Sequence, residues 1–300
     1  MPASLSCQIE LPARFRGDTI LPFHQRDAQQ QAERVDGGCL RKGLLWHGQP
    51  ACLELRIADG HAVAGLAIDG MARADDDERL EAMARRMLGL TQAIADFERQ
   101  YATHPELGAL IARQAGLRVP QTATPFEALA WAITGQQISV AVAVSLRRRL
   151  IAAAGLRHTG SGLYCHPEAQ QVAALGEDSL RGCDFSAGKT RALLTVSRLQ
   201  AAGELPLDDW LAHPSPGALR ERLAAIKGIG PWTIGYTLLR GYAWLDGSLH
   251  GDVAVRRALG QLRGNDAMPS EAETRSWLEA FTPWRALVAA HLWASLQLSA

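Results

Sequence analysis

The stretch from Leu223 to Asp252 limits the possible folds more than any other part of the chain, because a turn built on two glycines joins two helical segments there. Apolar residues at helical spacing predict a first helix that ends before Gly228. Gly228 and Gly230 permit positive φ and leave backbone N–H groups uncovered. Pro231 suits the first turn of the next helix, where its missing N–H costs nothing. The turn therefore directs N–H groups and the positive end of a helix outward, which favours contact with a phosphate.

Aromatic residues and one aspartate follow this turn. Trp232, Tyr236 and Leu239 lie on one stripe of the second predicted helix. Asp252 comes twenty residues after Trp232, behind a loop that contains glycine. Taken alone, Asp252 stands at a favoured N-cap position for a helix over 253–260. The aromatic stripe, taken alone, is typical of a helix face that packs in a core.

The motif Gly-Ile-Gly-Pro-Trp-Thr at 228–233, with Asp252 at this distance, resembles the helix-hairpin-helix DNA glycosylases, the HhH-GPD superfamily. The alkylation-repair branch, DNA-3-methyladenine glycosylase II, is the most similar branch. The resemblance covers residues 105–300 and extends more faintly to the N-terminal part. It implies an α+β fold, in which a small antiparallel-sheet N-terminal domain precedes a two-lobed, mostly α-helical region with a cleft between the lobes.

The same resemblance implies an activity. The chain is expected to be a DNA glycosylase of base excision repair that hydrolyses the N-glycosidic bond of alkylated purines, such as 3-methyladenine and 7-methylguanine. Its partner would be double-stranded DNA, from which the damaged base is flipped out. Bifunctional members of the superfamily carry a lysine that forms a Schiff base at the position where this chain has Trp232. We therefore expect a monofunctional enzyme that leaves an abasic site.

The resemblance assigns catalysis to Asp252. Cleavage of the N-glycosidic bond develops positive charge on the sugar, and one carboxylate near it can stabilise that charge and orient or deprotonate a water. An alkylated purine is already cationic, so it needs no protonation to leave. Asp246 lies in the same loop, but its spacing to the hairpin is short for the family. The alternative is that Asp252 only caps a helix, and the two roles can coexist.

Three aromatic residues are implied as the base pocket: Trp232, Tyr236 and Trp293. A flipped methylated purine stacks well on aromatic faces, in part through cation–π attraction. The alternative is that these residues are simply core.

Two turns are expected to contact DNA. In the hairpin, the resemblance implies phosphate contacts by Gly228, Ile229, Gly230 and Thr233. In the turn between two earlier helices it implies contacts by Gln136 and Gln137, with Gln137 filling the space that the flipped base leaves. The alternative is that both amides satisfy backbone groups at helix ends. A structural monovalent cation is also implied, bound by the backbone carbonyls of Ala224, Ile226 and Ile229.

The first 73 residues are predicted to form the N-terminal α/β domain. Turn signals and alternating apolar residues predict an antiparallel meander over 38–70. A strand is predicted over 19–23 and a helix over 27–35. This part shows no recognisable chemistry, and the resemblance implies that it supports packing.

From residue 74 onward glycine is sparse and helical periodicity dominates. The helical HhH-GPD region is therefore predicted to span 74–300, with the hairpin at 223–242 and the catalytic loop at 243–252.

The formal net charge of zero argues mildly against nucleic-acid binding, because phosphate contacts require Lys and Arg. Arginines gather at 147–149 and 256–257, where a DNA-facing patch and a solvated helix face are equally compatible with the pattern. The five cysteines include no CxxC pair, so we expect reduced thiols, no zinc and no iron–sulfur cluster. No cofactor is expected to be required for catalysis.

The chain has no run of 18 apolar residues and starts without an apolar signal segment. We therefore expect a cytoplasmic protein, without membrane contact, that acts as a monomer. Two other functions remain compatible with the sequence. One is an HhH glycosylase for another damaged or mismatched base, and the other is a non-catalytic binder of damaged DNA, which would have no need of Asp252.

Overall fold

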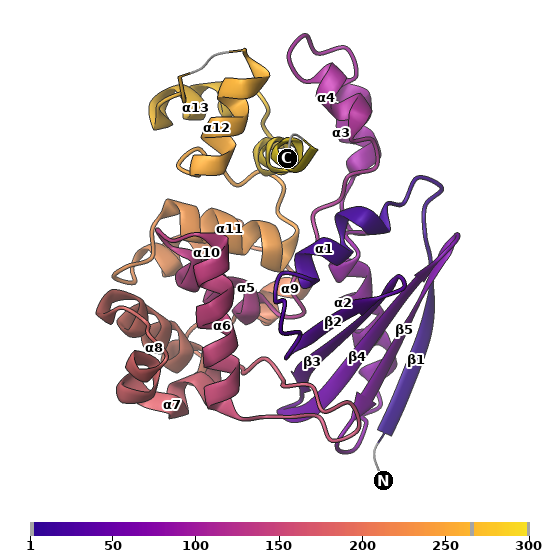
Figure 1. Ribbon diagram of the computed structural model, residues 1–300, viewed down its shortest axis with the longest axis vertical. Coiled ribbons are helices and arrows are strands. Elements are labelled where there is room, and N and C mark those ends of the chain that lie inside the picture. The colour runs from indigo at the N-terminus through magenta and orange to yellow at the C-terminus, as the bar shows by residue number, and fades with distance from the viewer. Residues whose placement is uncertain (1–2, 265–266, 299–300) are drawn as a thin grey trace.

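The computed structural model describes residues 3–264 and 267–298. A five-stranded antiparallel sheet occupies one side of the molecule, and helices form the remainder (Figure 1). The strands are β1 (Ala3–Glu10), β2 (Glu33–Asp36), β3 (Cys39–Trp46), β4 (Gln49–Ala58) and β5 (His61–Ile68). Their order is β1-β5-β4-β3-β2, so β3 to β5 form the meander predicted over 38–70, and β2 and β1 add to its two edges.

One face of the sheet is covered by α2 (Asp76–Met87), which shares a core with the sheet. In β5, buried and partly exposed side chains alternate, as expected for a sheet with one covered face. Leu80, Met83 and Met87 of α2 lie in that core. The core of this N-terminal unit therefore includes residues of α2.

The predicted strand over 19–23 and helix over 27–35 are wrong. The first segment forms the 3₁₀ helix η1 (Gly17–Thr19) and the short α1 (Leu21–His24). In the second, the Asp27 carboxylate accepts the N–H of Gln29 in a turn, and β2 begins at Glu33. Pairing with β3 overrides the local helical pattern, because four residues of β2 align with β3.

The helices form two lobes around separate cores, which confirms the predicted α+β fold (Figure 1). One lobe combines helices from the beginning and from the end of the helical region. It contains α3 (Ile94–Tyr101), α4 (Gly108–Arg113), α12 (Val253–Leu262), α13 (Glu271–Glu279) and α14 (Arg285–Leu298). The middle lobe contains α5 (Pro125–Gly135), α6 (Val140–Ala154), α7 (Ala169–Gly182), α8 (Ala187–Ala201), α9 (Asp209–Ala212) and α10 (Pro216–Ala224). None of the helices in the described ranges is both long and apolar enough to cross a membrane.

Helix α11 (Pro231–Tyr242) lies between the two lobes and contributes to both cores. Ile234 and Leu238 pack in the middle lobe, whereas Tyr236 and Leu239 pack in the other lobe. Residues on opposite faces of one helix thus join the lobes, so the first turn of α11 is held at their junction.

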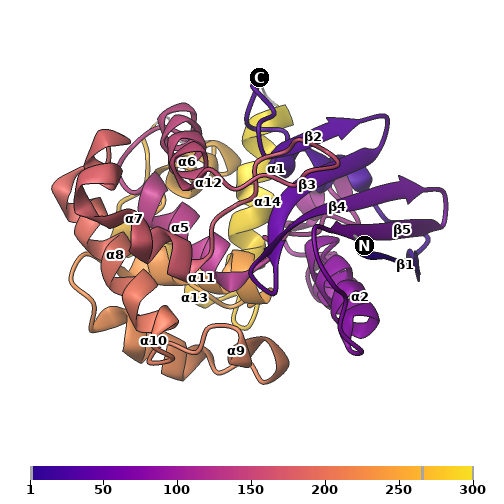
Figure 2. The same cartoon turned by 90° about the horizontal axis from the view of Figure 1, so that it is seen from below.

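A buried cluster of ion pairs joins the sheet to the middle lobe. The Lys42 ammonium of β3 is fully buried and donates to Glu33 and to Glu127 of α5, both at 2.6 Å. Arg147 of α6 donates to the same two carboxylates at 3.0 and 2.7 Å. Burial by itself would raise the pKa of Glu127, but Lys42 and Arg147, with His166, lower it to about 2. Seen from below, the sheet and the middle lobe lie on opposite sides of the molecule (Figure 2).

This cluster also decides the role of the arginines at 147–149. Arg147 lies in the buried cluster, Arg148 pairs with Asp27 at 2.9 Å, and Arg149 pairs with Asp184. All three guanidinium groups have acidic partners within the protein, so they do not form a free basic face.

Candidate active site

The hairpin between α10 and α11 depends on one glycine with positive φ. Gly228 has φ +94°, a conformation that disfavours any residue with a Cβ. It lies four residues after Ala224, the last residue of α10. Gly230 is extended and caps α11, which begins at Pro231 as predicted. Within the described part of the chain, the N–H groups of Gly228 and Gly230 have no acceptor. The turn thus has the free donors that a phosphate requires.

Gln136 braces this hairpin from the turn between α5 and α6. Its Nε2 donates to the carbonyl of Gly228 and to Oγ1 of Thr233, both at 2.9 Å. The side chain of Thr233 is buried, so its hydroxyl is occupied inside the protein. Gln137 is exposed and has φ +56°. The amide of Gln136 is therefore engaged inside the protein, on a carbonyl of the hairpin turn and a hydroxyl of α11, whereas Gln137 lies exposed at the tip of its own turn.

Asp252 caps α12 and also accepts two indole N–H groups. Its Oδ1 accepts the backbone N–H groups of Ala254 and Val255 at 2.9 and 3.0 Å. Nε1 of Trp293 donates to the same oxygen at 3.1 Å, and Nε1 of Trp232 donates to Oδ2 at 2.8 Å. The cap and the side-chain contacts thus coexist, and four donors orient one half-buried carboxylate.

The loop over 243–252 returns to α11 because Gly235 permits a close approach. A Cβ on Gly235 would lie 3.3 Å from the carbonyl oxygen of Ser248 and 3.2 Å from Leu249. Asp246 is engaged elsewhere, since Arg285 of α14 donates to its two carboxylate oxygens at 2.7 and 2.9 Å. The loop is therefore fixed at both ends, and Asp252 is the carboxylate that faces α11.

The three predicted pocket residues meet beside Asp252. The ring centroids of Trp232 and Tyr236 lie 5.3 Å apart, and those of Tyr236 and Trp293 lie 6.4 Å apart. Trp232 and Trp293 are half-buried, whereas Tyr236 is only 6% exposed. Trp232 and Tyr236 come from α11 and Trp293 from α14, so the cluster spans the junction of the lobes.

A sequence profile of the HhH-GPD superfamily base excision DNA repair proteins matches residues 130–283, which include the hairpin and Asp252. The chain belongs to the HhH-GPD superfamily. This match covers slightly more than half of the chain and runs from within α5 to the residues just before α14.

Two proteins similar in sequence to this one are named as DNA-3-methyladenine glycosylases. A DNA-3-methyladenine glycosylase of Bacillus subtilis is 31% identical over 172 residues, or 57% of this chain and 55% of that protein. DNA-3-methyladenine glycosylase 2 of Escherichia coli is 29% identical over 191 residues, or 62% of this chain and 63% of that protein. The matches thus span less than two thirds of the length of these relatives.

The fold extends the likeness to the entire chain. The structure matches a 3-methyladenine DNA-glycosylase from Archaeoglobus fulgidus with a TM-score of 0.81, covering 97% of this chain and 98% of that one. The sequence identity is 21%, so this match concerns the fold. It includes the sheet, which the superfamily profile does not cover.

Two residues near the aromatic cluster of this HhH-GPD protein are not evident from the sequence. Arg240 of α11 is buried, and its guanidinium carbon lies 4.6, 5.9 and 5.7 Å from the ring centroids of Phe23, Tyr236 and Trp293. Burial lowers the pKa of Arg240 to about 10. One feature of the sequence could have drawn attention to this residue, because Arg240 is the single charged residue of α11.

Phe23 comes from α1, in the part of the chain that was predicted to support packing only. The guanidinium carbons of Arg240 and Arg26 each lie 4.6 Å from the centroid of its ring. The N-terminal unit therefore reaches the aromatic cluster. The sequence could not reveal this, because no local pattern relates α1 to α14.

The predicted cation ligands run from the last residue of α10, Ala224, to Ile229 inside the hairpin turn. The carbonyl of Ile226 accepts the N–H of Ile229 at 3.1 Å, and a carbonyl oxygen has a second lone pair that can bind a cation. No group of three or more His, Cys, Asp or Glu side chains with the geometry of a metal site occurs among the described residues. The cation site stays a prediction.

Proposed function

We propose that this protein is a monofunctional DNA glycosylase that hydrolyses the N-glycosidic bond of alkylated purines, such as 3-methyladenine and 7-methylguanine, in double-stranded DNA. The observation that carries the proposal is the convergence of Trp232 and Trp293 on the carboxylate of Asp252. The names of the relatives from Bacillus subtilis and Escherichia coli support the same activity.

The geometry of Asp252 suits the chemistry. As the base leaves, positive charge develops on the sugar, and a fixed carboxylate stabilises it without reorganisation. Oδ1 accepts three hydrogen bonds and Oδ2 accepts one, so Oδ2 is the oxygen with free capacity toward a water or the sugar. A water activated by this carboxylate would attack the sugar carbon and complete the hydrolysis.

Trp232 occupies the position at which a bifunctional enzyme needs an amine. Its indole N–H donates to Asp252 and cannot form a Schiff base. The enzyme would therefore release the base and leave an intact strand with an abasic site.

The aromatic cluster favours a cationic purine. Such a base is attracted by the faces of Trp232 and Trp293, which are both half-buried at the junction of the lobes. The base must leave the duplex to reach them, and unstacking costs a few kcal/mol. We assign to Gln137 the role of filling the vacated space, and its neighbour Ile138, at 37% exposure, adds apolar surface to the same turn.

We also propose a structural monovalent cation at the carbonyls of Ala224, Ile226 and Ile229. Such an ion would bridge the hairpin and a DNA phosphate, and it would take no part in bond cleavage. The protein would act as a cytoplasmic monomer.

The test is the release of free base from duplex DNA treated with a methylating agent, with strand nicking scored before and after alkali. The proposal expects release of 3-methyladenine and 7-methylguanine, with nicks only after alkali. Nicking before alkali would contradict the monofunctional assignment. Binding of damaged DNA without release of methylpurines would leave another target base or a non-catalytic binder.

A further inference from the structure

The proposed binding of DNA needs a local source of positive charge, because the net charge of the protein is zero and many of its arginines are paired. The three arginines of α6 bind acidic partners inside the protein. Binding to a DNA backbone requires unpaired cations on the surface that faces it. One cavity of the described structure contains such cations.

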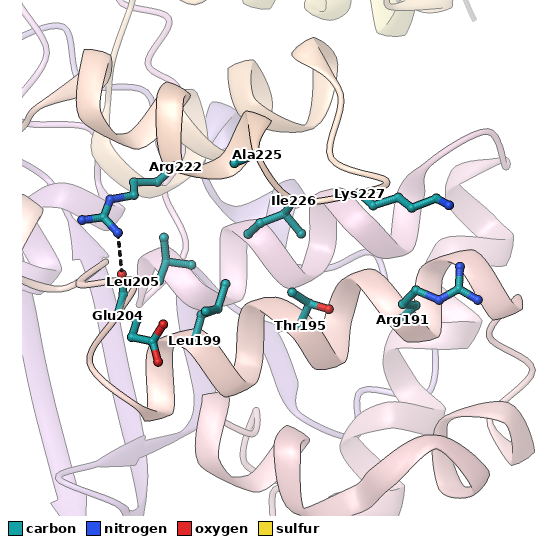
Figure 3. A pocket seen from close by; sticks show the side chains of 9 residues that line it. All are labelled: Arg191, Thr195, Leu199, Glu204, Leu205, Arg222, Ala225, Ile226 and Lys227. Atoms are coloured by element: carbon teal, nitrogen blue, oxygen red, sulfur yellow. Dashed lines mark hydrogen bonds between the residues drawn. The ribbon is translucent and has the colours of Figure 1, made fainter.

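This cavity has a volume of about 380 Å³ and lies between α8 and the segment that leads from α10 into the hairpin (Figure 3). One wall is the face of α8 that carries Arg191, Thr195 and Leu199 at intervals of four residues. The opposite wall ends at Lys227, the residue directly before Gly228. The cavity therefore opens beside the hairpin turn and away from the aromatic cluster.

The two ends of the cavity differ in charge. Figure 3 shows Arg191 and Lys227 at one end, on opposite walls. Both side chains are exposed, and neither has an ion-pair or hydrogen-bond partner among the residues the structure describes. At the other end, Arg222 donates to the backbone carbonyl of Glu204 at 3.5 Å. The two cations without a hydrogen-bond or ion-pair partner among the described residues thus lie at the end next to the hairpin.

The packing of α8 against the hairpin turn places the two cations at the same end of the cavity. A Cβ on Gly228 would lie 3.5 Å from the Cβ of Ala192, so α8 passes directly against the turn. Because Arg191 precedes Ala192 and Lys227 precedes Gly228, this contact brings the two side chains to the same opening. Two cations fixed on separate elements, with room between them, suit an anion that enters from outside.

We infer that Arg191 and Lys227 bind a backbone phosphate of the DNA strand that the hairpin holds, adjacent to the phosphate bound by the N–H groups of Gly228 and Gly230. This inference rests on the proposed function, since it takes DNA as the ligand. Arg191 would bind two phosphate oxygens through its planar guanidinium, and Lys227 would add a compact charge. The affinity of a neutral protein would then come from a local pair of cations and not from its overall charge.

The test is the salt dependence of DNA binding. The dissociation constant for a duplex with a stable abasic-site analogue is measured by fluorescence anisotropy over a series of salt concentrations. Each phosphate that is neutralised contributes about 0.9 to the slope of log K against log salt. The double variant Arg191→Gln, Lys227→Gln should lose about one unit of slope and bind roughly tenfold more weakly at physiological salt.

Arg222→Gln is the matched control, because it removes a cation from the opposite end of the same cavity. It should leave the slope unchanged. An unchanged slope in the double variant, with a wild-type thermal midpoint, would overturn the inference, as would an equal loss in Arg222→Gln. A wild type that shows the predicted slopes but releases no methylpurine would refute the proposed substrate alone. A wild type that releases methylpurine while the double variant keeps its slope would refute this inference alone.

Discussion

Replacing Asp252 by asparagine tests the candidate site more sharply than a simple loss of charge would. Oδ1 accepts three N–H donors, from Ala254, Val255 and Trp293, so the amide oxygen of the introduced asparagine would take that position. The amide NH₂ would then face Nε1–H of Trp232, which donates to Oδ2 at 2.8 Å in the wild type. Two donors would meet where one hydrogen bond existed.

The expected magnitudes follow from these contacts. Asparagine caps a helix about as well as aspartate, so α12 keeps its cap. An unpaired donor costs about 1–3 kcal/mol, and because Trp232 is half-buried we expect about 1 kcal/mol, a fall of roughly 2–4 °C in the thermal midpoint. Loss of the charge that stabilises the sugar cation should lower the rate of base release about 10²–10⁴-fold. Activity should therefore fall far more than stability.

The assay is single-turnover release of 7-methylguanine from a defined duplex, with thermal unfolding measured on the same preparations. Asp246→Asn is the control, because it makes the same substitution in the same loop at a carboxylate paired with Arg285. It should keep its activity within a few-fold. In a double-mutant cycle, Trp232→Phe should destabilise Asp252→Asn less than it destabilises the wild type. Retention of more than about a tenth of wild-type activity by Asp252→Asn would refute the catalytic assignment.

Three further predictions concern the scaffold. Lys42→Met leaves Glu33 and Glu127 buried with one cation fewer, so it should cost about 3–5 kcal/mol in calorimetric unfolding, and a loss below about 1 kcal/mol would contradict the role of the cluster. The folded-state pKa of Glu127, about 2, lies below its ordinary value of 4.5, so its contribution to stability is present above pH 4.5 and is lost as pH falls toward 2. Urea unfolding between pH 6 and pH 3 should therefore show a shallower decline for Glu127→Gln than for the wild type. Gly228→Ala should cost about 1–2 kcal/mol, because φ is +94°, and should weaken binding to abasic-site DNA, whereas equal affinity would count against the hairpin as a phosphate site.

The contact of Phe23 with Arg240 shows that the N-terminal unit, which was expected only to support packing, also reaches the surroundings of the aromatic cluster. The buried ion pairs of Lys42 fix the sheet to the middle lobe. The ring of Phe23, in α1, lies against the guanidinium of Arg240. Arg240 in turn lies near the rings of Tyr236 and Trp293. The sheet is therefore connected to the aromatic cluster through two side chains.

Much of the site could be predicted from the sequence because its signals are local. Gly228, Pro231 and the helical stripe of Trp232 and Tyr236 are confirmed as a hairpin and the first turns of α11, since glycine and proline conformations depend on few neighbours. The segment over 19–35 was predicted wrongly, because pairing of β2 with β3 outweighs its local helical pattern.

The sequence by itself determined the hairpin, the α+β fold class, and the aspartate and three aromatic residues that the structure brings together. The tertiary structure alone decided how they meet: Trp293 reaches Asp252 because α14 packs on α12, and Gln136 braces the hairpin from ninety-two residues away. It also decided which arginines are free, since pairing of Arg147 with Glu33 and Glu127 depends on contacts between the sheet and α6. Local conformation follows from a few neighbouring residues, whereas contacts across the chain follow from the burial of whole faces, and only the packed structure shows them.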